Sequence, residues 1–174
     1  MTRWLILIIN FVLICFSSAT GYAQESETKA SQAFRSTEYP LPRFVSLRSN
    51  EAYVRTGPGR KYPVKWVYKR AGIPVEIVLE YDVWRKIHDF DGEKGWVHKS
   101  LLSGNRTAFI QGEELVGLYK KPNQDSRVRA YLQPNLLVSV EECDDGWCRV
   151  EAREYSGWLK QSTIWGVYEA ENFN

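Results

Sequence analysis

The chain has 174 residues, and its 23 lysines and arginines against 21 aspartates and glutamates give a formal net charge of +2. This length allows one ordinary domain or two very small ones. A nearly neutral chain without a continuous basic run lacks the electrostatic pattern of a nucleic-acid-binding protein, so no nucleic-acid partner is expected. Aromatic residues make up 14% of the sequence, there is one methionine, and no long window keeps a helical apolar period. These features predict an all-β fold.

Residues 1–23 are typical of a secretory signal peptide. An apolar stretch at 4–16 follows Met-Thr-Arg, and Gly21-Tyr22-Ala23 has the small-x-small pattern that signal peptidase recognises. The stretch is shorter than the roughly 20 residues of a membrane-spanning helix, so we expect no stable membrane span. Lipoprotein processing at Cys15 is disfavoured because the bulky Ile14 precedes it. We therefore predict cleavage after Ala23 and a periplasmic or secreted location.

Residues 24–42 are polar and end in Tyr39-Pro40-Leu41-Pro42. This composition predicts a flexible linker that becomes extended at the prolines. A Pro-x-Pro segment could also be recognised by a domain of the same chain, but a linker is the simpler interpretation.

The remaining chain contains the same pattern twice. Trp84 falls on Trp147 at an offset of 63 residues, and without a gap the same offset also pairs Tyr68 with Tyr131, Val75 with Val138, and Asp82 with Asp145. One deletion then aligns Gly95-Trp96 with Gly157-Trp158. The alignment predicts two homologous domains, repeat one at 43–104 and repeat two at 108–168, followed by a tail at 169–174. About five short strands in each would form a small barrel or sandwich.

The connection between the repeats is only a few residues long, at 103–106. We therefore expect the two repeats to pack against each other. Trp165-Gly166-Val167-Tyr168 follows the second Gly-Trp strand and is a candidate to seal that contact or to close the second barrel.

Cys143 and Cys148 flank the turn Asp144-Asp145-Gly146. In an exported chain such a pair predicts a disulfide that pins a hairpin. In the chain-entropy model so short a loop contributes roughly 2 kcal/mol. A zinc site would need more ligands than this pair offers.

The residues Val54-Arg55-Thr56-Gly57-Pro58, the Trp84 hairpin and Gly95-Trp96-Val97 resemble the bacterial SH3 domain family. The resemblance covers nearly all of repeat one. Repeat two keeps the Trp147 hairpin and Gly157-Trp158-Leu159 but has Leu118-Tyr119-Lys120-Lys121-Pro122 in place of the Arg-x-Gly-Pro element, so it is a diverged copy. The resemblance implies two tandem SH3-like β-barrels that bind cell-wall peptides or proteins without catalysis.

Flat aromatic side chains can stack on peptide or sugar faces, and they therefore supply most of the candidate ligand-binding residues. The full set, with Arg55 from the family signature, is Arg55, Tyr62, Trp66, Tyr68, Trp84 and Trp96. Trp66 has two interpretations. The 63-residue offset directs Val67 inward, whereas the family spacing turns Val64, Trp66 and Tyr68 inward, and the two registers place opposite faces in the core.

His88 and His98 are the only histidines, and strand alternation places them on one face of adjacent strands, with Ile87 and Val97 on the core face. A third metal ligand of the same parity is missing, so we expect no metal and no cofactor. Asp89, Asp91 and Glu93 surround Gly92 in a predicted hairpin turn and are expected to be solvated. With both mature cysteines committed to a disulfide, no catalytic residue is predicted.

Charge divides unevenly between the repeats. Residues 43–106 carry 13 basic and 7 acidic residues, whereas residues 107–174 carry 7 basic and 11 acidic ones. A basic repeat one favours an anionic partner. We therefore expect a monomeric, non-catalytic protein that binds a peptidoglycan peptide or an envelope protein through repeat one. A scaffold subunit of an envelope enzyme and a minimal wall hydrolase that uses His88 or His98 are the alternatives.

Overall fold

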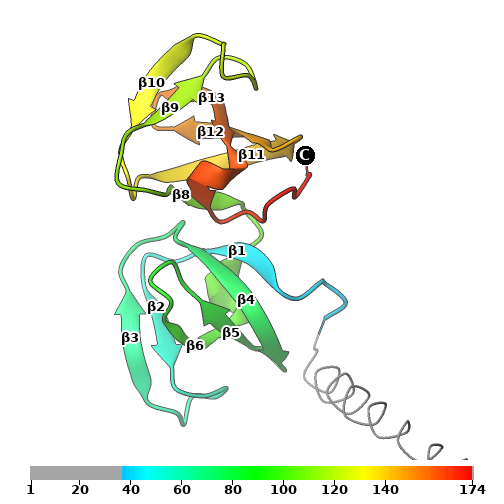
Figure 1. Ribbon diagram of the computed structural model, residues 1–174. Helices are drawn as coiled ribbons and strands as arrows, with labels where there is room; N and C mark the ends of the chain where they lie inside the picture. Colours follow the sequence, from blue (N-terminus) through cyan, green and yellow to red (C-terminus); the bar gives the residue numbers. More distant parts are fainter. Residues whose placement is uncertain (1–36, 174) are drawn as a thin grey trace, which may run out of the picture. The chain divides into compact units, whose positions relative to one another are not determined.

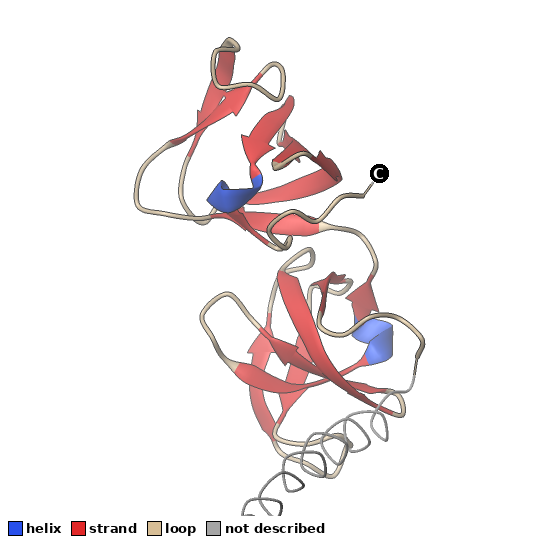
Figure 2. Cartoon of the chain, turned by 45° about the vertical axis from the view of Figure 1, so that its right-hand side comes forward, coloured by secondary structure: helices blue, strands red, loops and turns tan. Residues whose placement is uncertain are grey.

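The computed structural model describes residues 37–173, which belong to one compact unit (Figure 1). The predicted signal peptide, its cleavage site and the first part of the predicted linker lie outside the described residues. The described chain consists of strands and loops, with two single-turn 3-10 helices, η1 (Lys99–Leu101) and η2 (Gln161–Thr163) (Figure 2). The predicted all-β fold is therefore confirmed.

Two seven-stranded antiparallel sheets follow each other along the chain. The first contains β1 (Arg43–Leu47), β2 (Ala52–Arg55), β3 (Val64–Tyr68), β4 (Pro74–Tyr81), β5 (Trp84–His88), β6 (Lys94–His98) and β7 (Leu102–Ser103). The second contains β8 (Thr107–Ile110), β9 (Val116–Tyr119), β10 (Val128–Leu132), β11 (Leu137–Asp144), β12 (Trp147–Ala152), β13 (Tyr155–Lys160) and β14 (Ile164–Trp165). Their strand orders, β3-β2-β6-β5-β4-β1-β7 and β10-β9-β13-β12-β11-β8-β14, are the same when each strand is matched to its counterpart. The predicted duplication is thus confirmed: the two repeats have the same strand topology.

Each sheet curves around its own core. Period-two alternation turns one side of every strand inward, as in β2, where Ala52 and Val54 are fully buried while Tyr53 is exposed. Ile87 and Val97 are also fully buried, which confirms the predicted core face of β5 and β6. The equivalent positions of repeat two hold Val150 and Leu159, both without exposed surface.

A close strand crossing explains the Gly-Trp pair of each repeat. A Cβ atom on Gly95 would lie 2.3 Å from a methyl of Val54, and one on Gly157 would lie 2.6 Å from the carbonyl oxygen of Tyr119. Only glycine lets β6 approach β2, and β13 approach β9, this closely.

The two hairpin turns aligned by the sequence are also equivalent. Asp82 and Asp145 both adopt left-handed backbone conformations, with φ of 50° and 46°, and each begins the turn before its tryptophan strand. Aspartate tolerates this conformation better than most residues.

The predicted gapless pairing of Tyr68 with Tyr131 is wrong by one residue. Ala52 pairs with Tyr68 on β3, and its counterpart Val116 pairs with Leu132 on β10, so these strands are related by 64 residues rather than 63. The segment between β3 and β4 is one residue longer in repeat one than its counterpart in repeat two. Because side chains alternate along a strand, this slip exchanges the inner and outer faces of β10.

The corrected register resolves the orientation of Trp66. Trp66 and Tyr68 pack against the core of repeat one, while Val67 lies on the outer side of β3. Val64, which the family spacing turns inward, is 41% exposed because the pairing of β2 and β3 is irregular between Val54 and Arg55.

Aromatic side chains from both repeats meet within the compact unit. The rings of Phe44 and Trp165 are 5.0 Å apart, and those of Phe44 and Tyr168 are 4.7 Å apart. The hydroxyl of Tyr168 also donates a 2.8 Å hydrogen bond to Glu76. These contacts confirm that the repeats pack together and that the segment after the second Gly-Trp strand seals the contact.

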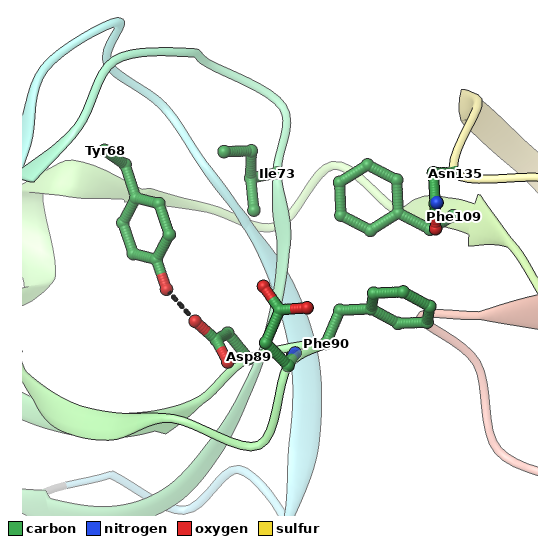
Figure 3. A pocket seen from close by; sticks show the side chains of 7 residues that line it. Tyr68, Ile73, Asp89, Phe90, Phe109 and Asn135 are labelled. Carbon is green, nitrogen blue, oxygen red and sulfur yellow. Dashed lines mark hydrogen bonds between the residues drawn. The ribbon is translucent and has the colours of Figure 1, made fainter.

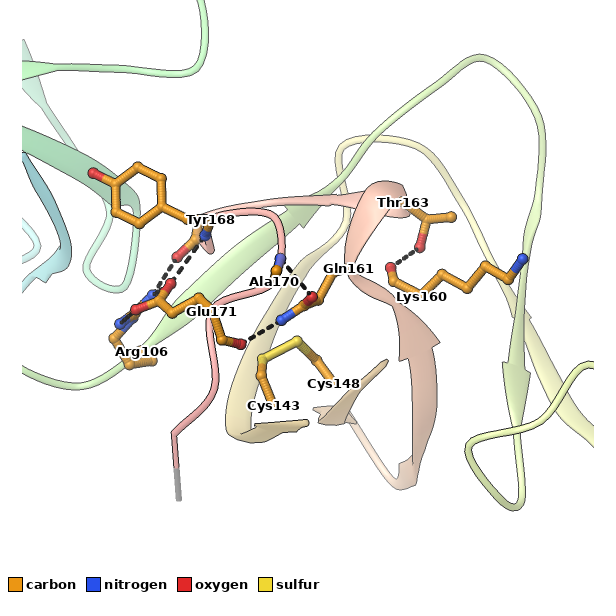
Figure 4. Close-up of a disulfide and its surroundings, with 10 residues drawn as sticks. Arg106, Cys143, Cys148, Lys160, Gln161, Thr163, Tyr168, Ala170 and Glu171 are labelled. Atoms are coloured by element: carbon orange, nitrogen blue, oxygen red, sulfur yellow. Dashed lines mark hydrogen bonds and ion pairs between the residues drawn. A yellow bond between two sulfur atoms is a disulfide. The ribbon is translucent and has the colours of Figure 1, made fainter. Parts of the chain in front are cut away.

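The predicted disulfide joins Cys143 of β11 to Cys148 of β12, which are directly opposite each other with Cα atoms 4.1 Å apart (Figure 4). The backbone N–H and carbonyl of Cys143 bind Phe173 rather than the strand of Cys148. The N–H of Cys143 donates to the carbonyl of Phe173 at 2.8 Å, and its carbonyl accepts from the N–H of Phe173 at 2.9 Å.

The segment before Phe173 is fastened to the body of repeat two by side chains. Both carboxylate oxygens of Glu171 accept 2.8 Å hydrogen bonds from Arg106, and the buried amide of Gln161 bonds the backbone at Ala170 and Glu171 (Figure 4). The predicted tail therefore packs on the disulfide edge.

The described end of the predicted linker is held by a buried carboxylate. Glu80 has no exposed surface and contacts Arg43, Arg85 and Thr37. Burial alone would raise the pKa of Glu80, but the hydrogen bonds from Arg43 and Thr37 and the charges of both arginines lower it to about 2. The Glu80 carboxylate therefore ties residues before β1 to β4 and β5.

We predict that Glu80→Gln lowers the free energy of unfolding by about 3–5 kcal/mol, because Arg85 is left buried without its counter-charge. The pKa of Glu80 is lower in the folded state, so its contribution is complete above about pH 4.5 and is lost as the pH falls towards 2. Urea titrations of the two proteins should differ most near neutral pH and converge in acid. A difference that stays constant with pH would contradict this assignment.

Reduction of the disulfide should lower the free energy of unfolding by roughly 2 kcal/mol, since the closed loop is short. Hydrogen exchange should speed up at the amides of Cys143 and Phe173, while Ile87 and Val97 in repeat one keep their protection. Equal loss of protection in both repeats would show that the disulfide supports more than its own sheet edge.

Candidate functional site

The outer face of β2, β5 and β6 in repeat one carries the side chains that alternation turns away from the core. Arg55 pairs with Trp96, and Trp84 pairs with His98. Tyr53, two residues before Arg55, lies on the same side of β2 and is 43% exposed. This face therefore combines aromatic rings with a guanidinium group.

A pocket of about 240 Å³, here called the Trp84 pocket, opens on this face and is lined by Tyr53, Arg55, Arg60, Trp84, His98, Ser100 and Leu101. The indole of Trp84 is mostly buried, and its ring meets that of His98 edge-on at 5.5 Å. The floor of the pocket is thus rigid, whereas Tyr53 and Arg60 at its rim are exposed.

Arg55 shapes the loop beside the pocket. Its guanidinium donates hydrogen bonds to the carbonyls of Tyr62 and Arg60, at 2.8 and 3.2 Å. The ring of Tyr62 covers Gly57 so closely that a Cβ there would lie 2.5 Å from it. The Arg-x-Gly-Pro element therefore builds a compact loop, and Tyr62 serves that loop rather than lining the pocket.

Among the lysine, arginine and acidic side chains of the described residues, only arginines line the Trp84 pocket. Arg55 and Arg60 both contribute to it, and no carboxylate is among the described residues that line it. Guanidinium groups bind carboxylates and phosphates with directed hydrogen bonds, and aromatic walls favour flat or apolar surfaces beside them. The pocket suits an anionic group attached to a planar or apolar body.

The equivalent place in repeat two carries different side chains. Trp96 pairs with Arg55, and its counterpart Trp158 pairs with Tyr119, so Tyr119 occupies the position of Arg55. The ring of Tyr119 packs edge-on against Trp147 at 5.5 Å and lies over Gly117, which replaces Tyr53. Repeat two thus has a tyrosine ring in place of Arg55. Its residues Trp147, Lys160 and Ser162, the counterparts of Trp84, His98 and Ser100, line a different pocket of about 520 Å³ that opens towards residues 169–172.

The six ligand-binding candidates predicted from the sequence lie at three different places in repeat one. Arg55 and Trp84 line the pocket, Trp96 is half-buried beside Arg55, and Tyr62 supports the loop. Trp66 and Tyr68 lie on the core side, with their rings edge-on at 6.0 Å.

The sequence prediction missed several pocket residues: Tyr53, Arg60, His98, Ser100 and Leu101. Alternation around the buried Val54 could have indicated Tyr53. For His98, strand alternation predicted the outward direction but not the pocket. Arg60 lies on a loop, and Ser100 and Leu101 lie on a helical turn, where no strand periodicity marks their direction.

His88 and His98 lie at opposite ends of the β5–β6 ladder, where they face Lys94 and Trp84. Nδ1 of His88 is 3.2 Å from a carboxylate oxygen of Glu76, and Nδ1 of His98 is 2.7 Å from the hydroxyl of Ser100. Within residues 37–173 no group of three or more histidine, cysteine or acidic side chains is placed to hold a metal ion.

The acidic turn around Gly92 is only partly solvated. Asp91 and Glu93 are exposed as predicted, but Asp89 is buried, which corrects the expectation for that residue. Its carboxylate accepts hydrogen bonds from the backbone of Asp91 and Glu93 and from the hydroxyl of Tyr68. Hydrogen bonding of the turn explains why a carboxylate is buried here.

Two stretches of the chain, residues 48–104 and 112–166, match the family model of the bacterial SH3 domain. Together they make up more than half of the sequence, and the chain belongs to this family. No curated protein matches the chain. Across residues 37–173, no helix has the length and apolarity needed to cross a membrane.

Among solved structures, the chain is similar to NlpC1 and NlpC2 from Trichomonas vaginalis. In each comparison the sequence identity is 16%, the TM-score is 0.34, and 74% of this chain is covered. The match covers 47% of NlpC1 and 49% of NlpC2, so this chain corresponds to about half the length of either protein.

Proposed function

We propose that this chain is an exported, non-catalytic binding protein that recognises an anionic peptide of the cell envelope through the Trp84 pocket. The observation that carries the proposal is the contrast between the repeats, since Arg55 and Arg60 make the pocket cationic in repeat one, whereas Tyr119 replaces Arg55 and packs on Trp147 in repeat two. Membership of the bacterial SH3 family supports an envelope ligand. The disulfide supports an oxidising compartment outside the cytoplasm.

The chemistry of the pocket favours a carboxylate-bearing ligand such as a peptidoglycan peptide. Arg60 at the rim is exposed and can turn its guanidinium to the ligand, while Arg55 is held by the loop carbonyls and contributes a fixed charge. The ring of Tyr53 offers a flat surface at low entropic cost. Because the charges are partly exposed, binding should weaken as salt concentration rises.

A protein ligand is the second candidate, and it is favoured by exposed apolar side chains on repeat two. Leu115 is 58% exposed and Tyr131 is 66% exposed. Tyr131 of β10 pairs with Gly117 of β9, and Leu115 lies directly before β9, two residues from Gly117. A scaffold that positions an envelope enzyme would use such a surface.

The absence of catalysis is part of the proposal. The thiols of Cys143 and Cys148 are joined to each other, and each histidine has its Nδ1 beside a neighbouring oxygen of Glu76 or Ser100. This arrangement supports structural roles for the four side chains that could otherwise act as nucleophile or base.

Binding is tested by co-sedimentation of the purified protein with isolated peptidoglycan, at low and high salt. Arg60→Glu and Tyr53→Ala should each weaken retention, the charge reversal by about tenfold or about 1.4 kcal/mol. Arg127→Glu is the control, because it makes the same charge change at an exposed position of repeat two. Retention that is equal in all three variants would contradict the Trp84 pocket as the site.

Two further variants separate the two ligand classes in a pull-down from envelope extract. Loss of a co-purifying protein on Leu115→Ser or Tyr131→Ser, with peptidoglycan retention unchanged, would favour the scaffold function over the peptide-binding one.

Catalysis is tested by release of soluble fragments from peptidoglycan. We expect the wild-type protein and the double variant His88→Ala, His98→Ala to release no more than buffer does. Release by the wild-type protein that the double variant lacks would establish the hydrolase alternative.

A further inference from the structure

A second pocket has the opposite chemistry to the Trp84 pocket. Its volume is about 260 Å³, and it is lined by Tyr68, Ile73, Asp89, Phe90, Asp91, Phe109 and Asn135 (Figure 3). It is smaller than the roughly 300–1,000 Å³ of pockets that hold drug-sized molecules, so it suits a single side chain. We call it the Phe90 pocket.

The walls of the Phe90 pocket are apolar and fixed. The rings of Phe90 and Phe109 are 5.5 Å apart and tilted by 52°, and Phe90 also contacts Trp165 edge-on at 5.6 Å. Ile73 completes the apolar lining. Such walls accept an aliphatic chain and present ring faces on which a cation is attracted.

The charged groups that line the Phe90 pocket are both carboxylates. Asp89 is 7% exposed and fully engaged, since one oxygen accepts the N–H groups of Asp91 and Glu93 at 3.1 and 2.8 Å and the other accepts the hydroxyl of Tyr68. Burial and this hydrogen bond raise the pKa of Tyr68, so its hydroxyl stays protonated. The phenol therefore keeps donating to Asp89 and adds no negative charge.

Asp91 is different. It is exposed, and through its side chain it makes no hydrogen bond or ion pair with any residue in 37–173. No lysine or arginine is among the described residues that line the pocket. One carboxylate beside the aromatic walls is therefore free for a ligand.

Repeat two shows that the fold does not require these polar groups. Leu132 takes the place of Tyr68, and the 63-residue relation between Ile87 and Val150 puts Ala152 at the position of Asp89. The same relation puts Arg153 at the position of Phe90. Apolar side chains stand at the positions of Tyr68 and Asp89 in repeat two and an arginine stands at that of Phe90, so the tyrosine, aspartate and phenylalanine distinguish repeat one.

We propose that the Phe90 pocket binds a primary ammonium group on an aliphatic stem, as in a lysine-like side chain of a peptide. The stem packs on Phe90, Phe109 and Ile73, and the ammonium reaches the carboxylate of Asp91 and the ring faces. A neutral apolar ligand would leave Asp91 unused, and an anion would be repelled by both carboxylates. The site is separate from the Trp84 pocket and does not depend on the function proposed for it.

The test uses Nα-acetyl-L-lysine methylamide as the probe and amide chemical shifts of the full chain as the readout. We expect saturable shifts at Phe90, Asp91, Phe109 and Asn135. The Nε-acetylated lysine probe and the norleucine probe, which lack the charge, should give much smaller shifts. Shifts of equal size with the three probes, or none at these amides up to the solubility of the lysine probe, would overturn the proposal.

Asp91→Asn should weaken binding of the lysine probe about two- to fivefold, the range of an exposed ion pair. Asp125→Asn is the matched control, because it removes one exposed carboxylate from a loop of repeat two. An unchanged affinity of the Asp91→Asn protein would exclude the assigned carboxylate. Arg60→Glu should bind the lysine probe as the wild-type protein does, so failure of this site and failure of the Trp84 pocket are distinguishable.

Discussion

The approach of β6 to β2 at Gly95, and of β13 to β9 at Gly157, is the constraint on which both repeats depend. With no Cβ at these positions, the strand that carries the tryptophan can cross directly over Val54 or Leu118 and complete the wall of the core. The same crossing brings Trp96 beside Arg55, and Trp158 beside Tyr119. The partner of the tryptophan differs between the repeats: it is Arg55, which lines the Trp84 pocket, in repeat one and Tyr119 in repeat two. One backbone requirement thus determines both the closed core and the place where a ligand site can form.

The two repeats keep this framework and differ in what they place on it. In repeat one, guanidinium and carboxylate groups line separate pockets, around Trp84 and around Phe90. In repeat two, Tyr119 replaces Arg55, and Leu132 and Ala152 stand at the positions of Tyr68 and Asp89. Repeat two instead contributes Trp165 and Tyr168 to the contact with Phe44, along with the disulfide. The charged side chains on which both binding proposals rest therefore lie in repeat one, whereas the disulfide lies in repeat two, although the two repeats share one topology.

The sequence was sufficient for features that depend on local pattern. Turn residues and tryptophans revealed the duplication, and the spacing of Cys143 and Cys148 indicated the hairpin disulfide. It was insufficient where a single loop residue changes the register, as between Tyr68 and β4, because both registers present apolar side chains to the core. It also missed the burial of Asp89, which accepts hydrogen bonds within its turn and from Tyr68 of β3. The pocket positions of Tyr53 and Arg60 were missed because they depend on how a strand and a loop meet in the folded domain.

The bonding of Arg106 links two distant parts of repeat two. Arg106 lies in the short connection between the repeats, yet its guanidinium holds Glu171 and the carbonyl of Gly166 and stacks on the ring of Phe173. Phe173 in turn exchanges two backbone hydrogen bonds with Cys143, which is covalently tied to Cys148. The residue that enters repeat two and the last described residues are therefore joined to the same crosslinked edge, so the sheet is closed by side chains and a disulfide as well as by its strand pairing.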